Sequence, residues 1–185
     1  DLGASTFEGC SSLATITLPS EIEELGDSLF KDCKSLSSIT IPDSVTSIGM
    51  STFENCSTLT QIKIPDAVET LGMFAFQGCT ALQTATLGKG ITEVDYGTFL
   101  GDCALKSVTL PNNLETIGAF SFQGCMALKT LTIPQKVKKI ANGAFRDTAI
   151  KFTLPKGSLF EVKDEMLLSK DGKTIYYAPN TFRGE

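Results

Sequence analysis

The stretch LSSITIPDSVTSIGMSTFENCSTL, residues 36–59, decides the fold because it holds one complete structural repeat. Its Leu36, Ile39 and Ile41 match the leucine-rich pattern L-x-x-L-x-L. The two isoleucines alternate with polar residues, which is typical of a short strand with one buried face and one solvent-exposed face. The first half of the stretch therefore predicts a strand at residues 38–41.

The second half of the stretch predicts a turn, a return path and a compact bend. Pro42 presets φ for a turn and Asp43 can bond to its own backbone. Gly49 permits a tight bend before the apolar residues resume. Phe53 and Cys56 lie three residues apart, which suits a 3₁₀-like turn. This segment is too short for an ordinary α-helix.

The same pattern recurs every 23 residues along nearly the whole chain. The phenylalanines of the repeat are Phe7, Phe30, Phe53, Phe76, Phe99, Phe122 and Phe145. The leucines are Leu13, Leu36, Leu59, Leu82, Leu105 and Leu128, and the prolines are Pro19, Pro42, Pro65, Pro111 and Pro134, with Gly88 in the one missing place. Such a period indicates stacked units that bury one another's apolar faces.

The predicted architecture is a right-handed, mainly β leucine-rich-repeat solenoid over residues 1–155. Six to seven coils stack, beginning in the middle of a repeat, since Leu2-Gly3 corresponds to Leu25-Gly26. We read that start as a piece of a longer protein. Strands at equivalent places should pair in parallel and in register, roughly 4.8 Å apart, in one sheet on one face.

One coil departs from the pattern. Ala85 replaces a branched residue, Gly88 replaces Pro, Asp95 replaces Gly, and Cys103 stands one place late, after Asp102. Two interpretations stay open: neutral variation in a redundant array, or a bend or contact point.

Residues 156–185 form a different, C-terminal segment. The apolar runs 166–170 and 173–177 flank Asp171-Gly172, a dipeptide that favours a type I′ hairpin. We predict a hairpin that caps the last coil or joins it to another array.

The strings IPDSVTSIG (41–49) and STFENCSTL (51–59) closely resemble the BspA-like class of leucine-rich repeats. The segment 162–177 resembles the hairpin often found between or after such arrays. The resemblance implies a secreted or cell-surface protein of bacteria, or of some protozoa, with a role in adhesion. It implies no catalytic motif.

Composition narrows the function further. The chain has 185 residues, a formal charge of −5, and neither His nor Trp. Without His, the Ser-His-Asp and Cys-His nucleophiles cannot be built. The acidic balance argues against nucleic-acid binding. No apolar run is long enough for a membrane span, and no signal peptide opens the chain. We expect a monomer without cofactors.

The six cysteines all stand at or next to one repeat position. They are Cys10, Cys33, Cys56, Cys79, Cys103 and Cys125. Stacked side chains at equivalent positions point the same way, whereas a disulfide needs converging Cβ atoms. We therefore predict a buried ladder of thiols, without disulfides and without a metal site.

The solvent-exposed strand positions form a hydroxyl-rich surface. Candidate binding residues on this strand face are Thr17, Thr40, Gln61, Lys63, Thr84, Thr86, Thr109, Lys129, Thr132 and Lys151. The alternative is a soluble strand surface without a site, because Thr suits strands. Ice binding by regular threonine rows is disfavoured, since Gln61 and Lys63 interrupt the rows.

Charge is uneven along the chain. Residues 1–92 hold 4 basic and 11 acidic residues, and residues 93–185 hold 12 and 10. The basic residues of the later coils are Lys129, Lys136, Lys138, Lys139, Arg146, Lys151 and Lys156. They could form a patch for an acidic protein or a sulfated glycan, or be solvated side chains on different faces.

The preferred hypothesis is a non-catalytic, adhesin-type module that binds a host extracellular or cell-surface protein or glycan. A second hypothesis is a structural spacer in a larger surface protein. A third is a glycan-active enzyme, because acids such as Glu21, Glu23 and Glu24 cluster beside a turn. Turn acids without a cleft are usually only solvated, so we expect no catalytic residues.

Overall fold

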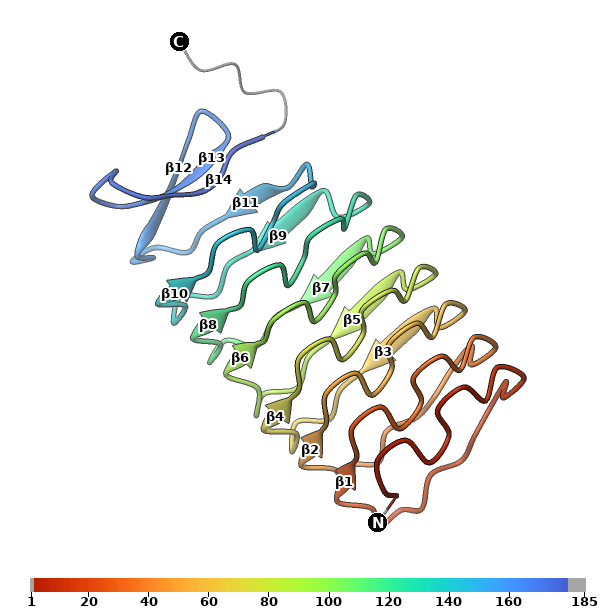
Figure 1. Ribbon diagram of the computed structural model, residues 1–185. Coiled ribbons are helices and arrows are strands. Elements are labelled where there is room, and N and C mark those ends of the chain that lie inside the picture. The colour runs from red at the N-terminus through yellow and green to blue at the C-terminus, as the bar shows by residue number, and fades with distance from the viewer. Residues whose placement is uncertain (1, 180–185) are drawn as a thin grey trace.

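The computed structural model describes residues 2–179, and within them the chain forms strands and turns and no helix. It winds into a solenoid whose coils stack along one axis (Figure 1). The strand face contains β3 (Gln61–Lys63), β5 (Thr84–Thr86), β7 (Ser107–Thr109), β9 (Thr130–Thr132) and β11 (Lys151–Thr153). A second set, called the side sheet here, contains β1 (Glu24–Leu25), β2 (Ser47–Ile48), β4 (Thr70–Leu71), β6 (Glu93–Val94), β8 (Thr116–Ile117) and β10 (Lys139–Ile140).

Pairing within the array is parallel and in register, as the 23-residue period predicts. Ile62 pairs with Ala85, and Ala85 pairs with Val108. At the last coil Lys151 pairs with Thr130, two residues short of a full period, because the sequence drops two residues there. The predicted leucine-rich-repeat solenoid is confirmed.

The core is a stack of phenylalanine rings along the axis. Rings from Phe7 to Phe145 lie parallel, with neighbouring centroids 5.4 to 5.8 Å apart. All of them are buried except Phe7, which is half-buried in the first coil. Each ring covers the next, so burial depends on neighbouring coils rather than on any one unit.

The short segment around each phenylalanine turns as the spacing predicts. Backbone N–H groups of Glu54, Cys56 and Leu59 each donate to the carbonyl three residues earlier. Left-handed residues such as Ser51, with φ of 57°, interrupt these bonds, so no continuous 3₁₀-helix forms. The N–H groups of Ser51 and Phe53 instead donate to the next coil.

The strand face is not the single continuous sheet that the repeat predicts. Residues 15–18 and 38–41 form no regular strand, and the sheet β3–β5–β7 is separate from the pair β9–β11. Strands of two or three residues form few hydrogen bonds, and the regular ladder is interrupted between residues 38–41 and β3 and again between β7 and β9.

The side sheet also breaks once, between β4 and β6. In the regular coils Gly49 and Gly72 donate backbone hydrogen bonds to the preceding coil, at 2.8 and 2.9 Å. A Cβ atom at Gly72 would lie 2.5 Å from the backbone nitrogen of Met50, so glycine permits this close approach. Asp95 occupies the same place in the irregular coil, and the backbone hydrogen bond to the coil before it is missing among residues 2–179.

The predicted thiol ladder is confirmed for four of the six cysteines. Cys33, Cys56, Cys79 and Cys125 are buried free thiols, and each bonds to a carbonyl of a phenylalanine in the preceding coil, at 3.1 to 3.2 Å. The prediction is wrong for the other two. Cys10 is exposed because no coil covers it, and Cys103 is half-exposed because Asp102 occupies the ladder position.

The end of the array is covered by an antiparallel sheet of β12 (Phe160–Lys163), β13 (Met166–Ser169) and β14 (Ile175–Tyr177). The Tyr177 ring meets Phe152 edge to face at 5.2 Å, and its hydroxyl donates to the Thr148 carbonyl at 3.3 Å. Residues 180–185 of the predicted C-terminal segment lie outside the described residues.

The predicted hairpin around Asp171-Gly172 forms, because β13 and β14 pair antiparallel there, but the predicted type I′ turn is wrong. Only Gly172 of that pair has a positive φ, in a longer loop closed by Ser169 and Thr174. Asp164 and Glu165 both have a positive φ and join β12 directly to β13, as a type I′ turn requires. The side-chain bonds from Asp171 to Ser169 and the Lys173 backbone stabilise the wider loop instead.

Candidate binding surfaces

The ten predicted binding residues are all exposed. Thr17 and Thr40 lie in the first coils, where no regular strand forms. Strands β3, β5, β7, β9 and β11 carry the others except Lys129. Lys129 precedes β9 by one residue, and its ammonium donates to the Met126 carbonyl at 2.7 Å. The carbonyl of Lys129 still accepts the Lys151 backbone N–H at 2.8 Å, but the Lys129 side chain is held by the preceding turn.

A hollow of about 540 Å³ opens on the strand face where residues 38–41 do not pair with β3. Five of the predicted residues line it: Thr40, Gln61, Lys63, Thr84 and Thr86. Asp43 adds a carboxylate and Ile39 an apolar floor. The hollow therefore combines hydroxyl, amide, ammonium and carboxylate groups over apolar side chains.

A second hollow, of about 400 Å³, lies at the break between β7 and β9. Thr109 and Thr132 line it together with Lys106 and Asn112. Each of these two hollows lies at a place where the strand ladder is interrupted. Lys151 lies elsewhere, in an apolar hollow between the last coil and the C-terminal sheet.

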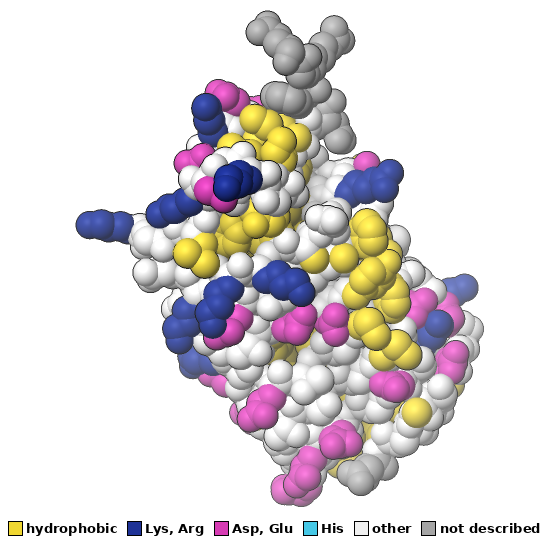
Figure 2. All heavy atoms as spheres, turned by 60° about the vertical axis from the view of Figure 1, so that its left-hand side comes forward, with side chains coloured by type: hydrophobic (Ala, Val, Ile, Leu, Met, Phe, Trp, Pro, Cys, Tyr) yellow, Lys and Arg dark blue, Asp and Glu magenta, His cyan; other side chains and the backbone are white. Residues whose placement is uncertain are grey.

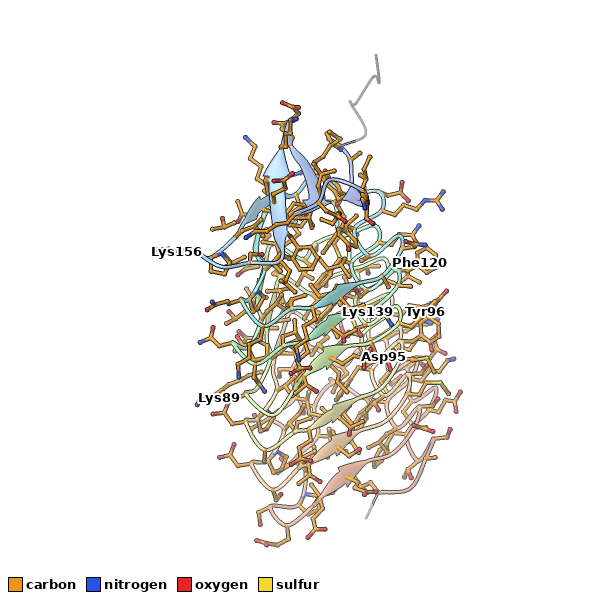
Figure 3. All side chains as sticks on the ribbon, turned by 90° about the vertical axis from the view of Figure 1, so that its left-hand side faces the viewer. Lys89, Asp95, Tyr96, Phe120, Lys139 and Lys156 are labelled. Atoms are coloured by element: carbon orange, nitrogen blue, oxygen red, sulfur yellow. The ribbon has the colours of Figure 1, made fainter. Side chains whose placement is uncertain are left out.

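Basic residues of the later coils do not gather in one patch. The Lys138 ammonium pairs with the Glu115 carboxylate at 2.9 Å. In Figure 3, Lys139 lies over the side sheet whereas Lys156 projects from the turn edge. The structure therefore favours solvated side chains on different faces over a continuous anion-binding surface.

The proline turns carry one further ion pair. The Lys89 ammonium pairs with Asp66 of the preceding coil. Their hydrogen bond lowers the pKa of Asp66 and raises the pKa of Lys89. Both side chains are largely exposed, so the pair adds little to stability.

The acids that suggested a glycan-active enzyme lie beside the turn of the first complete coil. Glu21, Glu23 and Glu24 are exposed on the first complete coil. Within residues 2–179 no group of three or more His, Cys, Asp or Glu could hold a metal ion.

Sequence reasoning missed one surface, called the aromatic ridge here. It consists of Met50, Met73, Phe74, Tyr96 and Phe120, which follow the side-sheet strands on four successive coils. Figure 2 shows a band of apolar side chains along one edge of the array. Figure 3 places Tyr96 and Phe120 on the opposite edge from Lys89 and Lys156. The sequence signal that could have revealed the ridge is the 23-residue register, because these residues replace small or polar ones at equivalent positions of other coils.

Comparison with known proteins identifies the repeat. A model of the BspA type leucine rich repeat region matches residues 1–102 and 98–180 in six copies. The chain belongs to the BspA-type leucine-rich repeat family. This membership indicates a repeat-based binding or structural module, and the BspA-type repeat and its fold are typically non-catalytic.

Solved structures of similar proteins support the same fold. A leucine-rich repeat protein from Bacteroides ovatus is 32% identical, with a TM-score of 0.78 over 84% of this chain and 41% of that one. One from Eubacterium ventriosum is 28% identical, with a TM-score of 0.65 over 82% and 46%. The T. pallidum leucine rich repeat protein is 26% identical, with a TM-score of 0.54 over 68% and 70%.

The BspA-type chain thus spans less than half the length of the first two of these structures. No curated protein matches it at comparable significance. Among residues 2–179, no helix is long and apolar enough to cross a membrane.

Proposed function

We propose that this BspA-type chain is a non-catalytic binding module of a secreted or cell-surface bacterial protein. Residues 1–155 bind a host extracellular or cell-surface protein or glycan as a monomer, and residues 156–185 cap the array or join it to another. The observation that carries the proposal is the hollow beside β3, which gathers five of the ten candidate residues.

The chemistry of that hollow suits recognition better than catalysis. Hydroxyl and amide groups of Thr40, Gln61 and Thr84 can donate and accept hydrogen bonds with sugars or peptide backbone. Lys63 adds a positive charge on β3, where it lines the hollow. Contacts repeated over several coils would add by avidity rather than from one deep pocket.

The test is a binding screen of the purified chain on arrays of extracellular-matrix proteins and glycans, at low and at physiological salt. We expect a saturable hit that survives physiological salt and that Lys63→Glu weakens at least tenfold. Lys173→Glu is the matched control, because Lys173 is an exposed lysine in the loop between β13 and β14.

Three outcomes would count against the proposal. Binding only at low salt would indicate nonspecific attraction to lysines. No hit at all would favour a structural spacer, which should tolerate charge changes anywhere on its surface. Release of reducing ends from a polysaccharide would favour the glycan-active enzyme.

A further inference from the structure

The aromatic ridge exposes more apolar surface than the fold requires. Met50, Met73 and Tyr96 are 42%, 41% and 37% exposed, and Phe74 and Phe120 are half-buried. Equivalent positions in other coils hold Ala4, Asp27, Asn142 or serine, so small or polar side chains satisfy the coil. Exposed apolar patches of this kind mark interaction sites.

Backbone conformation makes two of these residues more unusual. Phe74 and Phe120 have φ of 59° and 56°, in the left-handed region that bulky residues rarely adopt. The same position is Ser28 or Ser51 in earlier coils and Gly97 or Gly143 in later ones. Folding alone would favour glycine there, so the phenylalanines need another reason.

The aromatic rings of the ridge pack against one another and against the neighbouring coils. The Tyr96 ring meets Phe74 edge to face at 5.1 Å and Phe120 at 5.4 Å. A Cβ atom at Gly97 would lie 2.6 Å from the Phe74 ring, and one at Gly143 would lie 2.5 Å from the Phe120 ring. The glycines of alternate coils therefore leave the space in which the phenylalanine rings lie.

Carboxylates border the ridge on its own coils, and the lysines on or beside the side sheet, Lys138 and Lys139, lie on the next coil, beyond Phe120. The coils of the ridge carry Glu69, Glu93, Asp95 and Glu115 on or beside the side sheet, and of these only Glu115 has a lysine partner in the described part of the chain, Lys138. Figure 2 shows carboxylates beside the apolar band. One Asp95 oxygen accepts the Tyr96 backbone N–H at 2.6 Å, which leaves the other oxygen for a cation next to the aromatic ring.

We propose that the aromatic ridge binds a protein segment that presents apolar side chains next to lysine or arginine. The ridge supplies the aromatic and methionine contacts that are enriched in protein interfaces, and its acidic border supplies the complementary charge. The thioethers of Met50 and Met73 can adapt to apolar side chains of different shapes. This surface lies apart from the strand face and goes beyond the function proposed for it.

The experiment selects short peptides from a random displayed library on the intact chain and measures the Kd of enriched synthetic peptides. We expect enriched peptides to combine aromatic or aliphatic residues with Lys or Arg. The combined variant Phe74→Ser, Tyr96→Asn, Phe120→Ser should weaken their binding at least tenfold. Each replacement occupies the same position in another coil, so the fold should tolerate it. Met126→Ser, at a methionine that is 60% exposed outside the ridge, is the control.

A charge test separates this partner from a purely hydrophobic one. The same peptides with Lys and Arg changed to Glu should bind at least tenfold more weakly. If the combined variant does not fold, Met73→Asp, which copies Asp27, replaces it.

Any of four results would overturn the proposal: no enrichment of peptides, enrichment of peptides without basic residues, an unchanged Kd for the ridge variant, or an unchanged Kd for the charge-reversed peptides. Loss of glycan-array binding in the ridge variant would assign the surface to a sugar. Self-association in sedimentation that the ridge variant abolishes would assign it to a second copy of the chain.

Discussion

The coil around Phe76 and the coil around Phe99 share one core but differ in their sheets. Both rings are buried in the same stack, with centroids 5.6 Å apart. The strand that precedes Phe76 pairs with the coil before it, whereas the strand that precedes Phe99 does not. Asp95 and Asp102 are the residues that set the second coil apart. The two coils therefore stay joined without the side sheet, through the stacked rings, the pairing of β3 with β5, and backbone bonds such as Phe76 N–H to the Thr98 carbonyl at 2.9 Å.

The largest effect should come from removing a ring of the shared core. We expect Phe76→Ala to lower the free energy of unfolding by about 3–5 kcal/mol, because neighbouring coils cannot fill the space. Phe7→Ala should cost clearly less, since Phe7 is half-buried and covered on one side only. Urea unfolding of both variants measures the difference, and equal losses would contradict the stacked-core model.

Asp102, in the coil around Phe99, stands where the coil around Phe76 has Cys79. Its carboxylate is fully buried, and neither oxygen has a hydrogen-bond partner within residues 2–179. Burial raises its pKa well above the usual value. We expect Asp102→Cys, which restores the ladder residue, to stabilise the chain by about 1–3 kcal/mol at neutral pH.

The same residue predicts a pH dependence of stability. An aspartate in the unfolded chain titrates near pH ~4, so at higher pH the folded state must hold a proton that the unfolded state has released. The stability contributed by the neutral carboxyl is complete below pH ~4 and is lost as the pH rises through the raised pKa. Urea unfolding of Asp102→Asn should lack this decline, and an unchanged pH profile would show that Asp102 is not its source.

Asp95 predicts a smaller effect. Asp95→Gly should remove the side-chain bond to the Tyr96 backbone N–H and restore one backbone hydrogen bond to the preceding coil, worth about 0.5–1.5 kcal/mol. Hydrogen exchange of the residue 95 amide should slow, and β4 should pair with β6. Ala141→Gly is the control, because Ala141 already donates this bond to Ile117 at 2.8 Å. Unchanged exchange at residue 95 would show that another residue keeps β4 and β6 apart.

The period alone predicted the core, because equivalent residues in stacked coils meet equivalent neighbours. Phe53, Cys56 and Leu59 are buried as that reasoning requires. It could not predict the breaks in the strand face, since residues 38–41 and the paired strand β3 follow the same 23-residue pattern. It also missed the ridge, since the positions of Tyr96 and Phe120 hold small or polar residues such as Asp27, Ser28 and Asn142 in other coils and so are not apolar throughout the array.

The candidate strand face was predicted as a set of exposed positions and not as a shape. Alternation placed Thr84 and Thr86 on the solvent side, where the structure has them. The hollow that joins them to Thr40 lies where residues 38–41 do not pair with β3. No local pattern in the sequence indicates that this pairing is missing.

The smallest effect concerns the rate at which thiols react rather than the stability of the chain. Cys10 and Cys103 should react promptly with a thiol reagent in the native state, because both reach solvent. Burial raises the pKa of Cys33 to about 11, and it raises the pKa values of Cys56, Cys79 and Cys125 well above their usual range. These four thiols should react only after denaturation, since the thiolate is the nucleophile. Mass spectrometry after timed labelling would count the modified residues, and prompt labelling of Cys79 would show that the ladder opens to solvent.

In the Asp102→Cys variant, the introduced thiol should react as slowly as the four buried thiols, while Cys103 should still react promptly. The ladder position, rather than the residue type, determines this protection.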